Sequence, residues 1–166
     1  MFKQKTAPFP LEYEFVAMSQ PYAQEIAYEW KYTGKYSFYN IYKDKEEVER
    51  FLKPESWGNI FAAINVETKE LIGFTSYTFE NEVMWIGFGL KPNYTGKGHG
   101  EQFVRSAIEF GIEHYHYEES KVLLSVAKFN KRATKLYEKV GFKAIESKEI
   151  FVNGKLYPFT IMGIPV

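Results

Sequence analysis

The chain reads Leu90-Lys-Pro-Asn-Tyr-Thr-Gly-Lys-Gly-His-Gly100 just past its midpoint, and this stretch decides the fold. A segment typical of a strand precedes it, and apolar residues at helical spacing follow it, among them Phe103, Val104, Ala107 and Ile108. Glycines allow positive φ and close approach of the backbone to a ligand. The first turn of a helix leaves N–H groups without intrahelical partners and carries partial positive charge. A strand, a glycine-rich turn and a helix in this order therefore predict an anion site, most often for phosphate.

Two common phosphate-binding loops do not match this spacing. A P-loop requires G-x-x-x-x-G-K-S/T, whereas no Lys-Ser/Thr pair follows Gly96, Gly98 and Gly100. The dinucleotide fingerprint G-x-G-x-x-G needs a glycine at 101 or 103, where the chain has Glu101 and Phe103. That fingerprint also opens a doubly wound domain, and this loop lies too late in the chain for it.

The loop resembles the acyl-CoA loop of the GNAT superfamily of N-acetyltransferases, usually written Gln/Arg-x-x-Gly-x-Gly/Ala. Thr95-Gly-Lys-Gly98-His-Gly100 matches it at both glycines, and Pro92 stands where the family commonly has a proline. A second block resembles the family's strand, Asn-capped helix, Tyr and closing Gly-Phe: Val122-Leu-Leu-Ser-Val-Ala-Lys-Phe-Asn130-Lys-Arg-Ala133-Thr-Lys-Leu-Tyr137-Glu-Lys-Val-Gly141-Phe142. The strand pattern around both blocks extends the resemblance over most of the chain.

The resemblance implies one N-acetyltransferase domain over residues 1–166, of mixed α+β (α/β) class. A central, mostly antiparallel mixed sheet of about seven strands is expected, with helices on both faces and splayed central strands. Strands are predicted at residues 11–18, 60–66, 71–79, 83–90, 121–127, 142–152 and 156–164, and helices at 19–32, 44–53, 98–116 and 130–140.

Local signals mark the ends of these elements. Ser19 is predicted as an N-cap, and Asp44 as an N-cap with Glu47 as its capping-box partner. Gly141 is predicted to end its helix in the αL conformation. Asn153-Gly154 predicts a two-residue hairpin turn.

Composition narrows the class of protein. Hydrophobic residues make up 45% and aromatic residues 19% of the 166, which is typical of a globular chain. Lys plus Arg equals Asp plus Glu, 21 each, so no sustained binding of nucleic acid is expected. The lack of cysteine excludes disulfides, thiolate catalysis and Cys-based zinc sites. Without a transmembrane run or a signal-peptide core, a soluble cytoplasmic protein with no membrane partner is expected. The resemblance, which is strongest among bacterial members of the family, implies a bacterial protein, and no metal is expected.

Acetyl-CoA is the cosubstrate that the resemblance implies. Its binding is expected at the following residues: Phe88, Leu90, Thr95, Gly96, Lys97, Gly98, His99, Gly100, Glu101, Asn130, Arg132, Ala133 and Tyr137. Thr95 replaces the usual Gln or Arg, so its hydroxyl would supply a neutral hydrogen bond in place of a stronger charge-assisted one, with Lys97 able to compensate. His99 replaces an apolar residue and is also interpreted as packing. The basic residues Lys97, Lys128, Lys131, Arg132 and Lys135 form an expected rim for phosphates, or an ordinary solvated helix surface.

Two glycines in the strand before the loop, Gly87 and Gly89, allow two interpretations. They permit close approach of the pantetheine arm to the backbone around Phe88 and Leu90. Alternatively, they relieve crowding near Trp85 and Phe88.

Three groups are candidates for the chemistry. Tyr137 lies two turns beyond Asn130, and the resemblance implies that it donates to the departing sulfur; alternatively it is a core or rim aromatic. The Leu90 N–H would steady the carbonyl oxygen as it becomes negative. An alkylamine with a pKa near 10.4 needs a base more than an N-terminus does, and Glu82 is a candidate base, or an exposed turn residue.

The stretch 28–42 is unusually aromatic and corresponds to one wall of the family's acceptor site. Trp30, Tyr32, Tyr36 and Tyr39 are predicted to contact the substrate, partly by cation–π attraction. The same composition is typical of a homodimer interface or a lid. The predicted function is N-acetylation of a primary amine of an unidentified small molecule. A protein N-terminus, as in ribosomal-protein N-terminal acetyltransferases, and a non-catalytic acyl-CoA-binding module remain alternatives.

Overall fold

The computed structural model describes residues 12–166 and divides them into two compact units. The first comprises the described residues up to Ser76 together with Phe88–His99, and the second comprises Tyr77–Gly87 and Gly100–Val166. Two strands, β3 (Leu71–Glu80) and β4 (Val83–Leu90), contribute residues to both. Leu11, where the first predicted strand begins, lies outside the described residues.

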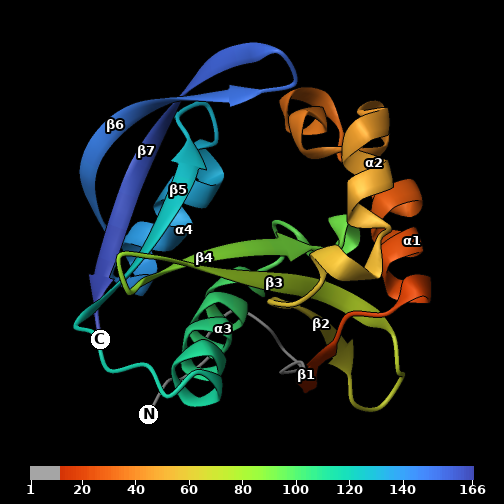
Figure 1. The fold of residues 1–166 in the computed structure, drawn as a ribbon, viewed down its shortest axis with the longest axis horizontal. Helices are drawn as coiled ribbons and strands as arrows, with labels where there is room; N and C mark the ends of the chain where they lie inside the picture. The colour runs from red at the N-terminus through yellow and green to blue at the C-terminus, as the bar shows by residue number, and fades with distance from the viewer. Residues whose placement is uncertain (1–11) are drawn as a thin grey trace. The chain divides into compact units, whose positions relative to one another are not determined.

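The seven strands form one sheet in the order β1-β2-β3-β4-β5-β7-β6 (Figure 1). The remaining strands are β1 (Tyr13–Ala17), β2 (Ile60–Asn65), β5 (Lys121–Ala127), β6 (Lys143–Val152) and β7 (Lys155–Pro165). β1–β2, β2–β3, β5–β7 and β6–β7 pair antiparallel, whereas β4 and β5 pair in parallel at Met84 with Val122 and Trp85 with Leu123. The predicted mixed, mostly antiparallel sheet is confirmed.

Two residues of β3 contact helices, one residue in each unit. Phe74 lies 6.1 Å from the Trp30 ring and 6.3 Å from the Phe51 ring, at the ends of α1 (Gln20–Glu29) and α2 (Lys45–Phe51). Tyr77 donates its hydroxyl to the Ala107 carbonyl of α3 (Gly100–His114) at 2.5 Å.

The first unit has its own apolar core between α1 and the strands. Its buried residues are Met18, Ala23, Ile26, Trp30, Ala62, Ile64 and Leu71. Fully burying one such large side chain contributes about 1.5–3 kcal/mol. Ala23 and Ile26 are three positions apart, so α1 turns one face toward this core.

α1 ends at Glu29, three residues before the predicted end. Trp30 takes φ −82° and ψ 99°, which stops the helix, because its indole N–H donates to Glu25 at 2.8 Å and its ring is buried. Three short 3-10 turns, at Gly34–Tyr39, Ile41–Lys43 and Pro54–Ser56, were not predicted.

Two predicted caps behave differently from one another. Asp44 accepts hydrogen bonds from the N–H groups of Glu46 and Glu47, which confirms it as the α2 cap. Its own N–H donates to Ile41 O, so the reciprocal capping-box bond to Glu47 was wrongly expected. Ser19 stands at the N-cap of α1, but its side chain makes no capping bond.

The second unit combines α3 and α4 (Lys131–Val140) with β5 and the β6–β7 hairpin. Tyr77 fits closely on α3, since a Cβ at Gly111 would meet its ring at 2.4 Å. The hairpin turns at Asn153 and Gly154, with φ of 50° and 79°, as predicted. Its tip extends past β5, because residues 155–158 of β7 lie beyond the β5 pairing (Figure 1).

Helix α3 is shorter than predicted at both ends. It begins at Gly100 because Gly98 has φ +82°, and it ends at His114, before His116 with φ +50°. None of the helices within residues 12–166 is long and apolar enough to cross a membrane.

Candidate active site

The loop after β4 has a backbone suited to holding an anion. Gly96 and Gly98 have φ of +71° and +82°, whereas Lys97 between them does not have positive φ. Glycines with positive φ are frequent in loops whose main-chain N–H groups converge on a phosphate. The glycines are therefore required by conformation, because other residues at these positions would be strained.

Thr95 differs from its predicted role as a phosphate donor. Its hydroxyl donates to the Pro92 carbonyl at 2.7 Å, and its N–H donates to the same oxygen at 3.2 Å. The side chain thus closes the short 3-10 turn Pro92–Tyr94 that leads into the loop. The Thr95 hydroxyl therefore donates its hydrogen bond within the chain, which the sequence did not predict.

A charged cluster lies at the foot of this loop. Lys91 Nζ is 3.0 Å from Glu70 Oε2 and 3.6 Å from Glu25 Oε2, and Tyr94 donates its hydroxyl to Glu70 Oε1 at 2.5 Å. The Tyr94 hydrogen bond is the main cause that lowers the Glu70 pKa. Burial, followed by Glu70, raises the Tyr94 pKa to about 12. Burial acts to lower the Lys91 pKa, but Glu70 and Glu25 outweigh it, and the net pKa is raised.

His99 closes the loop on its other side. Its ring meets that of Tyr94 edge-on at 5.7 Å. Nδ1 is buried and has no hydrogen-bond partner within residues 12–166. Burial, and then the charge of Lys97, lower the His99 pKa, which favours the neutral ring. The packing role expected for His99 fits this environment.

The end of β4 is crowded from within the chain. A Cβ at Gly89 would meet the Phe74 ring at 2.2 Å, so this glycine makes room for an aromatic ring, although not for the neighbours that the sequence suggested. The Leu90 carbonyl accepts a hydrogen bond from the Tyr32 hydroxyl at 2.5 Å. Tyr32 therefore joins the aromatic stretch to the strand that carries the predicted cofactor residues.

Buried side chains and hydrogen bonds hold part of the aromatic stretch in place. Asn40, only 4% exposed, bonds the Tyr32 backbone twice, at 2.7 Å and 3.0 Å. Trp30 is 2% exposed and belongs to the core, so we no longer assign it to the substrate. Lys35 Nζ lies 5.4 Å from the Tyr36 ring centre, so a lysine of the chain already faces that ring. Tyr39 is exposed.

In the second unit, α4 begins as predicted. Asn130 Oδ1 accepts from the Ala133 N–H at 3.0 Å and caps the helix. Tyr137, seven residues on, is half-buried, and its ring meets Phe142 edge-on at 5.9 Å. Gly141 ends the helix with φ +126°, a positive value that lies outside the αL region expected for it. The basic rim residue Arg132 is exposed.

The start of α3 is fixed by packing and charge. A Cβ at Gly100 would meet Leu136 Cδ2 of α4 at 2.7 Å, so this glycine allows the two helices to approach. Glu101 pairs with Arg105 at 3.4 Å and with Lys139 at 3.5 Å. Its side chain is thus engaged within the unit, and only its backbone remains a candidate contact for the cofactor.

Glu82 directly precedes β4, whereas Leu90, whose N–H is expected to contact the acyl oxygen, ends that strand. It is exposed in the turn between β3 and β4, with φ +68°. Eight positions separate it from Leu90, which is about 26 Å along an extended strand. We therefore do not retain Glu82 as a base.

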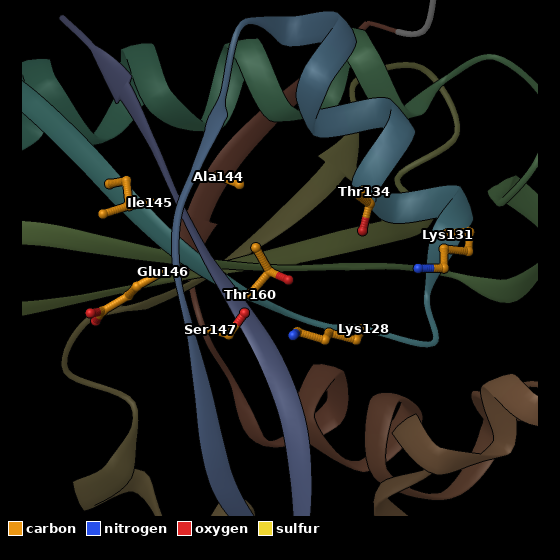
Figure 2. Close-up of a pocket in the computed structure, with 8 residues that line it drawn as sticks. All are labelled: Lys128, Lys131, Thr134, Ala144, Ile145, Glu146, Ser147 and Thr160. Atoms are coloured by element: carbon orange, nitrogen blue, oxygen red, sulfur yellow. The ribbon is translucent and has the colours of Figure 1, made fainter.

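A cavity of about 470 Å³ lies in the second unit beside the start of α4 (Figure 2). Eight residues line it: Lys128, Lys131, Thr134, Ala144, Ile145, Glu146, Ser147 and Thr160. Lys128, Lys131 and Ser147 are exposed. Lys128 and Lys131 belong to the basic rim expected for phosphates, whereas the other six lining residues were not predicted to contact the cofactor.

Sequence reasoning missed the residues that hold the loop and the aromatic stretch in place. Glu70 reads as a turn residue, and Asn40 as a polar loop residue. No local pattern marks either one, because their partners lie 24 and 8 positions away.

Comparison with known proteins gives a family match and a common fold. Residues 23–142 match the sequence profile of the Acetyltransferase (GNAT) family. A comparison with curated sequences finds no match. Spermidine N-acetyltransferase from Vibrio cholerae, in complex with CoA and spermine, superposes with a TM-score of 0.70 at 20% identity, covering 92% of this chain and 95% of that one. An acetyltransferase (GNAT family) from Bacillus anthracis gives a TM-score of 0.72 at 14% identity, covering 93% and 97%. At these identities the two structures show a common fold, while the profile match covers most of the chain, and the protein described here is therefore a member of the GNAT acetyltransferase family.

Proposed function

We propose that the chain transfers the acetyl group of acetyl-CoA to the primary amine of a small molecule. The observation that carries this proposal is the loop after β4, in which Gly96 and Gly98 take positive φ on either side of Lys97. Such a loop offers main-chain N–H groups to a diphosphate.

The residues present fit acetyl-CoA. Lys97 is exposed in the loop and can meet a phosphate charge. The other predicted contacts in this segment are main-chain groups, of Thr95, Gly96, Gly98, His99, Gly100 and Glu101. Phe88 and Leu90 at the end of β4 can pair with the pantetheine amides, although the Leu90 carbonyl already accepts from Tyr32. Asn130, Arg132 and Ala133 belong to the α4 start that the family motif assigns to the cofactor.

Acetyl-CoA supplies an activated acyl group on a thiol that leaves readily. The Leu90 N–H would donate to the acyl oxygen as it gains charge. The Tyr137 hydroxyl would donate to the sulfur. Full proton transfer from a phenol near pKa 10 to a thiolate near 8.5 is uphill by about 2 kcal/mol, so a hydrogen bond is the main expected role.

The acceptor is proposed from the relatives and from the aromatic stretch. The Vibrio cholerae relatives are named for spermidine, a small amine. Tyr32, Tyr36 and Tyr39 remain proposed acceptor contacts. Lysines already face two rings of this stretch, Lys35 at Tyr36 and Lys31 at Tyr42.

A screen of amines and of peptides, with free-thiol release as the readout, tests the proposal. Turnover with small primary amines and not with peptides is expected. Tyr137→Phe should lower turnover strongly while the CoA dissociation constant, measured by calorimetry, stays the same. Turnover restricted to peptide N-termini, or silence with every amine despite tight CoA binding, would contradict the small-molecule acceptor.

A further inference from the structure

Glu70 contacts two residues that flank the loop after β4. It directly precedes β3, and each of its carboxylate oxygens has a partner: Oε2 meets Lys91 Nζ at 3.0 Å, and Oε1 accepts from Tyr94 at 2.5 Å. Lys91 is the first residue after β4, and Tyr94 ends the turn before Thr95. One carboxylate thus connects the start of β3 to both ends of the segment that leads into the loop.

Tyr94 connects Glu70 to the far end of the loop, because its ring contacts His99. Its N–H donates to Lys91 O at 2.8 Å, and its ring lies edge-on to His99 at 5.7 Å. The contact between these two rings therefore joins the two ends of the segment that contains Gly96 and Gly98, the glycines with positive φ. A shift of the Tyr94 ring would move the His99 side of the loop and turn the N–H groups of Gly96 and Gly98.

The charges in this cluster argue against a direct electrostatic role in phosphate binding. Glu25 and Glu70 carry two negative charges against one positive charge on Lys91. A surplus negative charge repels an anion bound nearby. The benefit of Glu70 to a phosphate-binding loop is therefore geometric.

We propose that Glu70 is a positioning residue of the acyl-CoA loop, acting through Tyr94 and His99 to orient the N–H groups of Gly96 and Gly98. This inference rests on the proposed function, in which that loop binds the diphosphate of acetyl-CoA. In this role Glu70 acts through its contacts with Lys91 and Tyr94 and needs no contact of its own with the cofactor.

The test compares Glu70→Ala and Glu70→Gln with the matched control Glu67→Ala. Glu67 is exposed in the turn before Glu70 and has the same charge. Glu70→Ala should weaken CoA binding by about tenfold, the effect of losing one charge-assisted hydrogen bond. Glu70→Gln should lose less, because its amide oxygen still accepts from Tyr94. The control should bind CoA as the unaltered protein does.

A truncated thioester separates positioning from general damage. S-acetylpantetheine lacks the diphosphate, so its kcat/KM should be unchanged in Glu70→Ala, while the KM for acetyl-CoA rises and kcat stays constant. An equal loss with both thioesters would show a merely structural role and would overturn the inference. Tighter CoA binding by Glu70→Ala would also overturn it, because that result indicates charge repulsion.

Tyr94→Phe provides a second route if Glu70→Ala does not fold. It removes only the hydroxyl and should weaken CoA binding similarly, and Glu70→Gln in this background should add little. Independent, additive effects would contradict the shared contact. If the unaltered protein does not bind CoA, the proposed function fails together with the inference; if it binds CoA and all variants match it, the inference alone fails.

Discussion

Two segments of the first unit, both predicted to touch a substrate, are held in different ways. The loop at Thr95–His99 takes its shape from positive-φ glycines and from hydrogen bonds to the adjacent turn at Pro92 and to Glu70. The aromatic stretch at 30–42 is held by side chains, through buried Trp30, buried Asn40 and the Tyr32 hydroxyl. The shape of the loop thus depends mainly on backbone conformation, whereas the shape of the aromatic stretch depends on side-chain packing.

Among the variants that test this difference, Trp30→Ala should have the largest effect, on the stability of the first unit. Trp30 is 2% exposed and packs on Phe74, so truncation should lower the free energy of unfolding by about 3–5 kcal/mol. Urea denaturation measures this. Tyr28→Ala, at a residue 52% exposed, is the control and should change stability by less than about 0.5 kcal/mol. A loss confined to the KM of the amine would return Trp30 to the acceptor wall.

Gly98→Ala should have the next largest effect, in this case on the loop. Alanine at φ +82° is strained by about 1–2 kcal/mol, so CoA binding should weaken by about tenfold. Calorimetry measures the dissociation constant. Gly58→Ala is the matched control, because a Cβ there meets nothing within 4 Å. Unchanged CoA affinity in Gly98→Ala would show that the loop conformation is not needed.

The same contrast explains what the sequence could predict. Gly96, Gly98, Asn130 and Asn153-Gly154 were placed correctly, because a positive φ or a helix cap is a local requirement that few residue types meet. The seven strands were also placed within about two residues of their bounds, because apolar runs between turn residues are a local pattern. The roles of Trp30 and Glu82 depend on which distant residues surround them, and no local pattern records that.

Tyr32→Phe should affect the link between the two segments by a smaller amount. Losing the hydroxyl's bond to Leu90 O should cost about 1 kcal/mol of stability, since one neutral hydrogen bond is removed. The KM for the amine should rise while the CoA dissociation constant is unchanged. Tyr42→Phe, an exposed neighbour, should alter neither value. Parallel changes in amine and CoA binding would place Tyr32 with the cofactor instead.

Lowering the pH should have the smallest effect, a loss of the stability that the Glu70 carboxylate contributes through Tyr94 and Lys91. The Glu70 pKa is lowered from 4.5, mainly by the Tyr94 hydroxyl, so its contribution to stability is full above 4.5 and is lost as pH falls through the lower folded value. Because the Glu70 side chain is 36% exposed, solvent screens the interaction, and the contribution should be below about 1 kcal/mol. Urea denaturation from pH 6 to pH 3 should show the advantage over Glu70→Gln shrinking, with Glu67→Gln as the control. The Tyr94 pKa of about 12 keeps its hydroxyl protonated throughout, so an advantage that grows toward pH 3 would mean that Glu70 does not accept from Tyr94 as its charged form.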